Sequence, residues 1–226
     1  MEKRFRRILK LFNKIFNEDK EVILIISDDE IDVGGMATII NGIYHVIIFK
    51  ESLIFKTFKS NKTKLIVAEN TIVSHEVSHV YLSDIELFYS IQDPTVAVLF
   101  NALEDYRIDY ITDMLVIKGH KARMTYITGE LYKLIERAAA NLSQGDILKI
   151  YETDPKLNLM SIPMYLNGHT IFNILPTIDI RNILNKYKEE VHSDPFNKEI
   201  VYKYIDVLLP VVSKIDIVDY MSMFGR

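Results

Sequence analysis

The chain contains no cysteine and no tryptophan among its 226 residues, and it has only 8 glycines and 6 prolines. The absence of cysteine excludes disulfides, thiolate metal ligands and cysteine nucleophiles. No apolar run approaches the roughly 18 residues that a membrane-spanning helix requires. No secretory cleavage pattern follows the charged first residues, so we expect a soluble, cytoplasmic protein.

The chain also lacks an excess of positive charge. Its 27 Lys and Arg face 31 Asp and Glu, which gives a formal net charge of -4. A dedicated nucleic-acid binder usually carries a basic excess, so we expect no nucleic-acid partner. Hydrophobic residues make up 49% of the chain, which is enough to bury a substantial core.

Short β-branched runs occupy residues 21–27 and 44–49, with a third at 37–40 among several glycines. They predict three strands of a small N-terminal sheet. Residues 53–58 fit either a strand or a helical turn. Helical patterns follow at 66–84, 94–117 and 121–142, with shorter ones near 171–190 and 197–222.

A sheet followed by helices predicts an α+β fold with a small mixed β-sheet and a mainly helical remainder. Asp93 and Pro94 are suited to begin the second long helix, and Gly119 is suited to end it. Prolines and Gly168 interrupt the region after residue 150. We therefore expect a core over residues 1–150 and a helical C-terminal lobe over 151–226 packed on it.

Residues 4–16 form an amphipathic pattern, in which five basic side chains, with Lys3 just before them, lie largely away from the apolar stripe. Such a helix can lie on an anionic membrane or pack its stripe on its own domain. We favour packing on the domain, so membrane contact through this helix is not expected.

His75, Glu76 and His79 form the pattern H-E-x-x-H inside a helical segment. One helical turn separates the histidines, so both imidazoles can bind one metal ion. Glu76 flanks the position of a metal-bound water and can accept its proton. With 6 His and 15 Glu, shuffled chains would contain the pattern on the order of once in a hundred. The alternative is an incidental pair of helix histidines.

A zinc site needs a third protein ligand, which without cysteine must be His, Asp or Glu. No third histidine follows His79 closely. Glu104 shares a helix face with Ala97, Asn101 and Ile108, and this face can pack toward the two histidines. Glu104 is therefore the best candidate for the third ligand, against the alternative of a solvated face in which Glu104 and Arg107 pair.

The H-E-x-x-H pattern, followed on the next helix by Glu104, resembles the gluzincin branch of zinc metallopeptidases. The run NALEDYRID with the later GHKAR at 119–123 is similar to predicted metallopeptidase domains found beside von Willebrand A domains, in bacteriophages and in cobalt-chelatase subunits. The resemblance covers residues 65–140. It implies a zincin-like fold, one Zn²⁺ held by His75, His79 and Glu104, Glu76 as general base, and a bacterial cytoplasm or, for a phage protein, the host cytoplasm.

Metal-bound histidines usually donate their second ring N–H to a carboxylate or carbonyl. Asp105 and Asp109 are the nearest candidates, and Asn101 could fix the helix pair. Tyr106, His120, Arg123 and Tyr126 are candidates for stabilising an oxyanion, and the sequence does not choose among them. The remaining histidines, His45, His169 and His192, are expected to be solvated or locally hydrogen-bonded.

In the zincin architecture that the resemblance implies, an edge strand borders the cleft and can pair with an extended substrate. We expect residues 44–49 to be that strand. Gly34 and Gly35 fit either a role beside this cleft or a simple turn.

The leading hypothesis is a zinc-dependent metallopeptidase that hydrolyses peptide bonds of a peptide or protein substrate. The alternative is a catalytically silent zinc-binding assembly or adaptor protein that works with an ATPase or a von Willebrand A partner. This chain has no D-x-S-x-S motif of a von Willebrand A domain. Such a partner would therefore be a separate protein.

Overall fold

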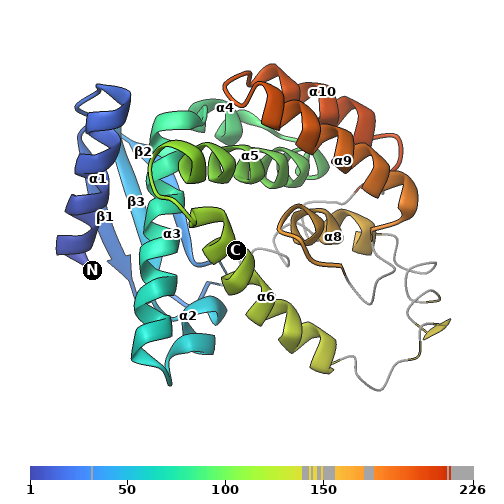
Figure 1. Cartoon of the computed structure of the whole chain (residues 1–226), viewed down its shortest axis with the longest axis horizontal. Coiled ribbons are helices and arrows are strands. Elements are labelled where there is room, and N and C mark those ends of the chain that lie inside the picture. The colour runs from blue at the N-terminus through green and yellow to red at the C-terminus, as the bar shows by residue number, and fades with distance from the viewer. Residues whose placement is uncertain are drawn as a thin grey trace. The chain divides into compact units, whose positions relative to one another are not determined.

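The computed structural model describes residues 1–31, 33–138, 143, 145–146, 149, 156–170, 176–212 and 214. It confirms the α+β expectation, because a small mixed sheet is followed by helices (Figure 1). The described chain divides into two compact units. The first is Met1–Ser90 with Ile108–Ile127, and the second is Ile91–Arg107 with the described residues from Thr128 onward. The boundary expected at residue 150 lies outside the described residues.

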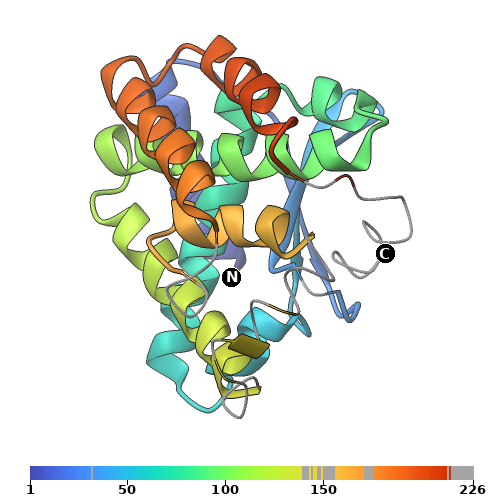
Figure 2. The same ribbon diagram turned by 90° about the vertical axis from the view of Figure 1, so that its right-hand side faces the viewer.

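The sheet of the first unit has three strands, β1 (Val22–Ser27), β2 (Gly35–Ile40) and β3 (Ile43–Phe49), in the order β1-β3-β2. β1 runs parallel to β3, and β2 runs antiparallel to it. Figure 2 shows the sheet from its edge. Asn41 and Gly42 join β2 to β3 with φ angles of 52° and 78°. Two consecutive positive φ angles are the mark of a tight hairpin turn.

The prediction that residues 44–49 form the edge strand is wrong. This segment is β3, which pairs with a strand on each side, and β2 is the edge strand next to it. The physical reason lies in burial, since Val46, Ile48 and Phe49 are buried. A nearly continuous apolar run is suited to a central strand that is covered on both faces.

Four helices complete the N-terminal part of this unit: α1 (Glu2–Phe16), α2 (Leu53–Phe58), α3 (Lys62–Leu82) and α4 (Ile85–Ser90). α3 packs against α1, α2, β2 and β3, and it is the helix around which the unit is built (Figure 1). α1 buries Phe5, Ile8 and Phe12, as expected for a helix that packs on its own domain. Residues 53–58 are helical rather than extended, and α4 was not predicted.

α5 (Pro94–Leu115) begins where the sequence predicts, because the Asp93 carboxylate accepts hydrogen bonds from the backbone N–H groups of Thr95 and Val96. It ends four residues before Gly119. Gly119 has a φ angle of 79° and lies in the turn that leads into α6 (His120–Ala138). The glycine therefore serves the turn between the helices rather than the helix end itself.

The second unit contains α8 (Lys156–Leu166), α9 (Ile178–Ser193) and α10 (Glu199–Leu208). α9 buries Ile180, Leu184, Tyr187 and Val191 along one stripe. The helix expected over 197–222 ends at Leu208, with turns through residue 212, and α8 forms in a region that prolines were expected to interrupt. No helix in the described part of the chain has the length and apolar character needed to cross a membrane.

Candidate metal centre

The H-E-x-x-H segment lies in the second half of α3, where every residue from 71 to 78 is buried. The helix begins at a capped N-terminus, because the Asn61 side chain accepts a hydrogen bond from the Lys64 backbone N–H at 3.1 Å. α3 is then covered by two helices and the sheet, so its histidines and glutamate are held in a protein interior. Polar groups in such a position need partners.

His75 and His79 face each other across one helical turn. Their Nε2 atoms are 3.3 Å apart, and the two rings meet edge to face with centroids 4.8 Å apart. Two nitrogen ligands of a tetrahedral zinc ion, each about 2.0–2.1 Å from the metal, lie about 3.3–3.4 Å from one another. The separation of these nitrogens is therefore the one that a shared zinc ion requires.

The other nitrogen of each ring has a separate partner. His75 Nδ1 is 2.8 Å from Asp109 Oδ1, and His79 Nδ1 is 3.0 Å from Ser83 Oγ. A hydrogen bond at Nδ1 orients the ring and leaves the Nε2 lone pair for a metal. Asp105 and Asp109 were the expected partners of the motif histidines. Asp109, in the first unit, contacts His75, whereas Asp105 belongs to the second unit.

Asp109 is buried and accepts a second hydrogen bond. His120 Nε2 is 2.7 Å from the same Oδ1 atom, and His120 Nδ1 is 3.1 Å from Ser74 Oγ. Burial raises the pKa of the Asp109 carboxyl, but the imidazoles of His75 and His120 together lower it by more than burial raises it. The pKa of this carboxyl therefore lies below its ordinary value. Asp109 is therefore a carboxylate that accepts from two N–H groups.

His75, Asp109 and His120 are also close enough together for their side chains to surround an ion. However, the 2.7 Å and 2.8 Å separations from Asp109 Oδ1 are ordinary hydrogen-bond lengths. Two nitrogen ligands of a tetrahedral zinc ion lie about 3.3–3.4 Å apart, which is farther than this. The Nε2 atoms of His75 and His79 therefore match zinc spacing better than the atoms around Asp109 do.

Glu76 is buried between α3 and the edge strand β2. A Cβ atom at Gly35 would lie 2.9 Å from Glu76 Cγ and 3.0 Å from Glu76 Oε1, which is too close for a side chain. Gly35 therefore gives the Glu76 carboxylate its space. This contact decides between the two readings of the glycine pair, because Gly35 begins β2 rather than forming only a turn.

The outer edge of β2 carries backbone groups that do not pair with β3. The Gly34 carbonyl accepts from the Phe49 N–H, so the alternation of an antiparallel pair turns the backbone groups of Gly35, Ala37 and Ile39 outward. The Tyr89 hydroxyl, on α4, donates to the Ala37 carbonyl at 3.1 Å. Within the described part of the chain, this outer edge begins beside Glu76 and is partly covered by Tyr89.

Glu104 belongs to the second unit, where it forms a bidentate ion pair with Arg107. Arg107 Nε and Nη2 donate to the two carboxylate oxygens at 2.8 Å and 2.6 Å, and both side chains are at most 3% exposed. Arg107 Nη1 also donates to the Pro195 carbonyl. The pairing that was weighed as the alternative is thus present, in a buried rather than a solvated form, and the role of Glu104 as a metal ligand stays a prediction.

Three other predicted residues, Asn101, Tyr106 and Arg123, make hydrogen bonds within their own units. In the second unit, Asn101 donates to Asp105, and the Tyr106 hydroxyl is 2.9 Å from His192 Nε2. In the first unit, Arg123 donates to the Lys118 carbonyl. Ser74, Ser83 and Tyr89 contact this region but are not among the residues that the sequence predicts. A serine beside or one turn after a histidine is a signal, but it is too common to select these residues.

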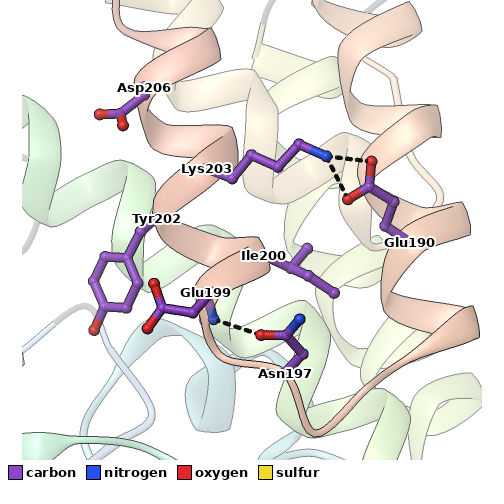
Figure 3. A pocket seen from close by; sticks show the side chains of 7 residues that line it. All are labelled: Glu190, Asn197, Glu199, Ile200, Tyr202, Lys203 and Asp206. Atoms are coloured by element: carbon purple, nitrogen blue, oxygen red, sulfur yellow. Dashed lines mark hydrogen bonds and ion pairs between the residues drawn. The ribbon is translucent and has the colours of Figure 1, made fainter.

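His45 Nδ1 is 2.9 Å from the Ile43 carbonyl, which fits the expected local hydrogen bonding. His169 packs edge to face on Tyr132. A separate pocket of about 450 Å³ lies beside α10 (Figure 3), and its described lining is Glu190, Asn197, Glu199, Ile200, Tyr202, Lys203 and Asp206. Its cation, Lys203, is already paired with both oxygens of Glu190, so this pocket offers no comparable chemistry.

Comparison of the chain with protein-family models, curated proteins and solved structures finds no match. The function must therefore be inferred from the residues of the site.

The buried pair of Glu104 and Arg107 predicts a large stability effect. Glu104→Ala should lower the free energy of unfolding by about 3–5 kcal/mol, because it leaves a guanidinium buried without its counter-charge. Urea denaturation followed by circular dichroism measures this loss. Glu130→Ala is the matched control, since it removes an exposed pair with Lys133 at similar sequence spacing and should cost at most about 1 kcal/mol. Equal small losses in both variants would contradict the prediction.

Proposed function

We propose that the protein is a zinc-dependent metallopeptidase of the gluzincin type with a zincin-like fold. The observation that carries this proposal is the 3.3 Å separation of the His75 and His79 Nε2 atoms, with the Nδ1 atom of each ring near a partner of its own. Two imidazole nitrogens so arranged are a suitable donor set for zinc. The expected cofactor, one Zn²⁺ per chain, therefore fits the residues present.

His75 Nε2 and His79 Nε2 would hold the ion, and the resemblance assigns the third ligand position to Glu104. Both Glu104 oxygens already accept from Arg107, but a carboxylate has about four lone-pair positions and can accept further partners. When bound, zinc supplies Lewis-acid chemistry, in which it activates water and polarises a carbonyl oxygen.

Glu76 is the proposed general base. Glu76 is next to His75 in the chain and its carboxylate lies against Gly35. In the proposed mechanism it would therefore lie between the reacting water and the edge strand. In this role it accepts the proton of the attacking water and delivers it to the nitrogen of the leaving amine. An extended peptide can pair with the outward backbone groups of Gly35, Ala37 and Ile39, which would bring its carbonyl near this carboxylate.

A catalytically silent zinc-binding adaptor, working with an ATPase or a von Willebrand A protein, is the second candidate. One observation favours it, since the Tyr89 hydroxyl already occupies the Ala37 carbonyl. A substrate strand would use this acceptor, so the bond must break before a peptide can pair there. The two candidates share the metal site and differ in whether Glu76 does chemistry.

The metal site can be tested by measuring bound zinc. Protein purified without chelator should contain about one zinc per chain by elemental mass spectrometry, and His79→Ala should lose most of it because a ligand is removed. Glu104→Gln, which retains one oxygen for Arg107, should also weaken zinc binding. His192→Ala removes an exposed histidine and should leave the zinc content unchanged. A folded wild type without zinc, even after incubation with zinc, would overturn the metal centre.

Catalysis can be tested separately at Glu76. Glu76→Gln should keep its zinc and lose about 10²- to 10⁴-fold in hydrolysis, because an amide cannot accept the proton. Cleavage of a library of internally quenched peptides, together with the zinc content, measures both properties. Cleavage by Glu76→Gln at the wild-type rate would exclude this mechanism. Absence of cleavage by the zinc-loaded wild type would favour the adaptor.

The contact between Gly35 and Glu76 gives a further prediction. Gly35→Ala should reduce hydrolysis at least tenfold with zinc retained, because the new Cβ displaces the Glu76 side chain. Gly34→Ala is the matched control, since its Cβ would meet Ile54 at the same 2.9 Å and the atoms nearest to it belong to Ile54 and Ile72 rather than to Glu76. Equal hydrolysis by the two variants would mean that the position of Glu76 does not limit the reaction.

A further inference from the structure

His120 is a fully buried residue to which the proposed chemistry gives no part. It is the first residue of α6, and the preceding Gly119, with its positive φ, allows the tight turn from α5. His120 Nε2–H donates to Asp109 Oδ1 at 2.7 Å, the same oxygen that accepts from His75 Nδ1. The Oδ1 atom of Asp109 thus accepts hydrogen bonds from two histidines on different helices.

The far side of His120 is also held. Its Nδ1 atom is 3.1 Å from Ser74 Oγ, and Ser74 precedes His75 on α3. The contacts form a series of side chains from Ser74 to His120, to Asp109 and to His75. Because Ser74 and His75 are neighbours on α3, the series begins and ends on that helix and joins it to α5 and α6. A Ser-His-Asp series is also found in hydrolases, but the Ser74 hydroxyl is buried and donates to the Thr71 carbonyl, so it is not a nucleophile.

A single hydrogen bond from His75 would leave the Asp109 carboxylate able to rotate about its side-chain torsions. The second donor, fixed by α6 and Ser74, selects one orientation in which Oδ1 points at His75. The His75 ring is then held with Nε2 toward His79. Outer partners of this kind typically change metal affinity by 10- to 100-fold.

We propose that His120 is a positioning residue, which fixes the Asp109 carboxylate and, through it, holds the Nε2 atom of His75 ready for the metal. The inference rests on the proposed metal centre. It adds a residue that the H-E-x-x-H motif does not contain, namely a histidine at the start of α6.

The test compares zinc affinity, by competition with a fluorescent chelator, in the full-length protein. His120→Leu removes the donor and should weaken zinc binding by 10- to 100-fold. His120→Gln places an amide N–H near the position of Nε2 and should restore the affinity to within a fewfold of wild type. Thr112→Val is the control, because it removes a buried hydroxyl on the same helix, 2.6 Å from Ser78, but leaves Asp109 untouched. It should bind zinc as the wild type does.

A second measurement does not need metal. Nitrogen-15 spectra of the zinc-free protein report which ring nitrogen of His75 carries the proton. The wild type and His120→Gln should show the proton on Nδ1, and His120→Leu should show a mixture of both tautomers. If His120→Leu fails to fold by circular dichroism, Ser74→Ala takes its place, because it releases the far side of His120.

Wild-type zinc affinity together with an unchanged His75 tautomer in a folded His120→Leu would overturn the inference and leave the metal centre intact. If the wild type itself binds no zinc, and His79→Ala behaves identically, the proposed function fails. The tautomer of His75 then still decides whether His120 positions that ring.

Discussion

The site depends on one buried oxygen atom, Asp109 Oδ1, which accepts hydrogen bonds from His75 and His120. A carboxylate in a protein interior is costly unless charged or polar groups compensate it. Here the two imidazoles do so, and they keep the pKa of the carboxyl below its ordinary value although burial opposes this. The need to satisfy this group ties α5 and α6 to the histidines of α3.

The need of buried polar groups for hydrogen-bond partners also explains the contacts around the motif. His79 Nδ1 lies near Ser83 at the end of α3, and the Ser78 hydroxyl contacts Thr112 on α5. With each Nδ1 placed beside a partner, the two Nε2 atoms remain together. Glu76 points from the same helix toward β2, where Gly35 has no side chain to obstruct it. α3, β2 and Gly35 therefore bring a carboxylate, two imidazole nitrogens and the outer edge of a strand together in one unit.

The second unit has a buried charge of its own. The guanidinium of Arg107 is enclosed and is compensated by the Glu104 carboxylate and the Pro195 carbonyl. A buried ion pair of this kind adds little net stability, but loss of one partner is costly. Glu104 therefore compensates the buried charge of Arg107 whether or not it also binds a metal. Helix-face spacing cannot predict this role, because two charged residues three positions apart can pair either in solvent or in the interior.

The sequence by itself determined the three strands, the long helices and the helical setting of His75, Glu76 and His79, because periodicity and end signals are local properties. It also placed Asp109 and His120 among the candidates but could not rank them, since the rotation of α5 and the start of α6 relative to α3 are set by packing. Strand order was likewise outside its reach, although the apolar run of residues 44–49 was a neglected sign of a central strand. Only the tertiary structure decided that Gly35 faces Glu76 and that one oxygen of Asp109 accepts from two histidines. The contacts of Gly35 with Glu76 and of His75 with Asp109 join residues 34 or more positions apart, and the contact of Asp109 with His120 depends on how the turn sets α6 against α5, so no local pattern encodes them.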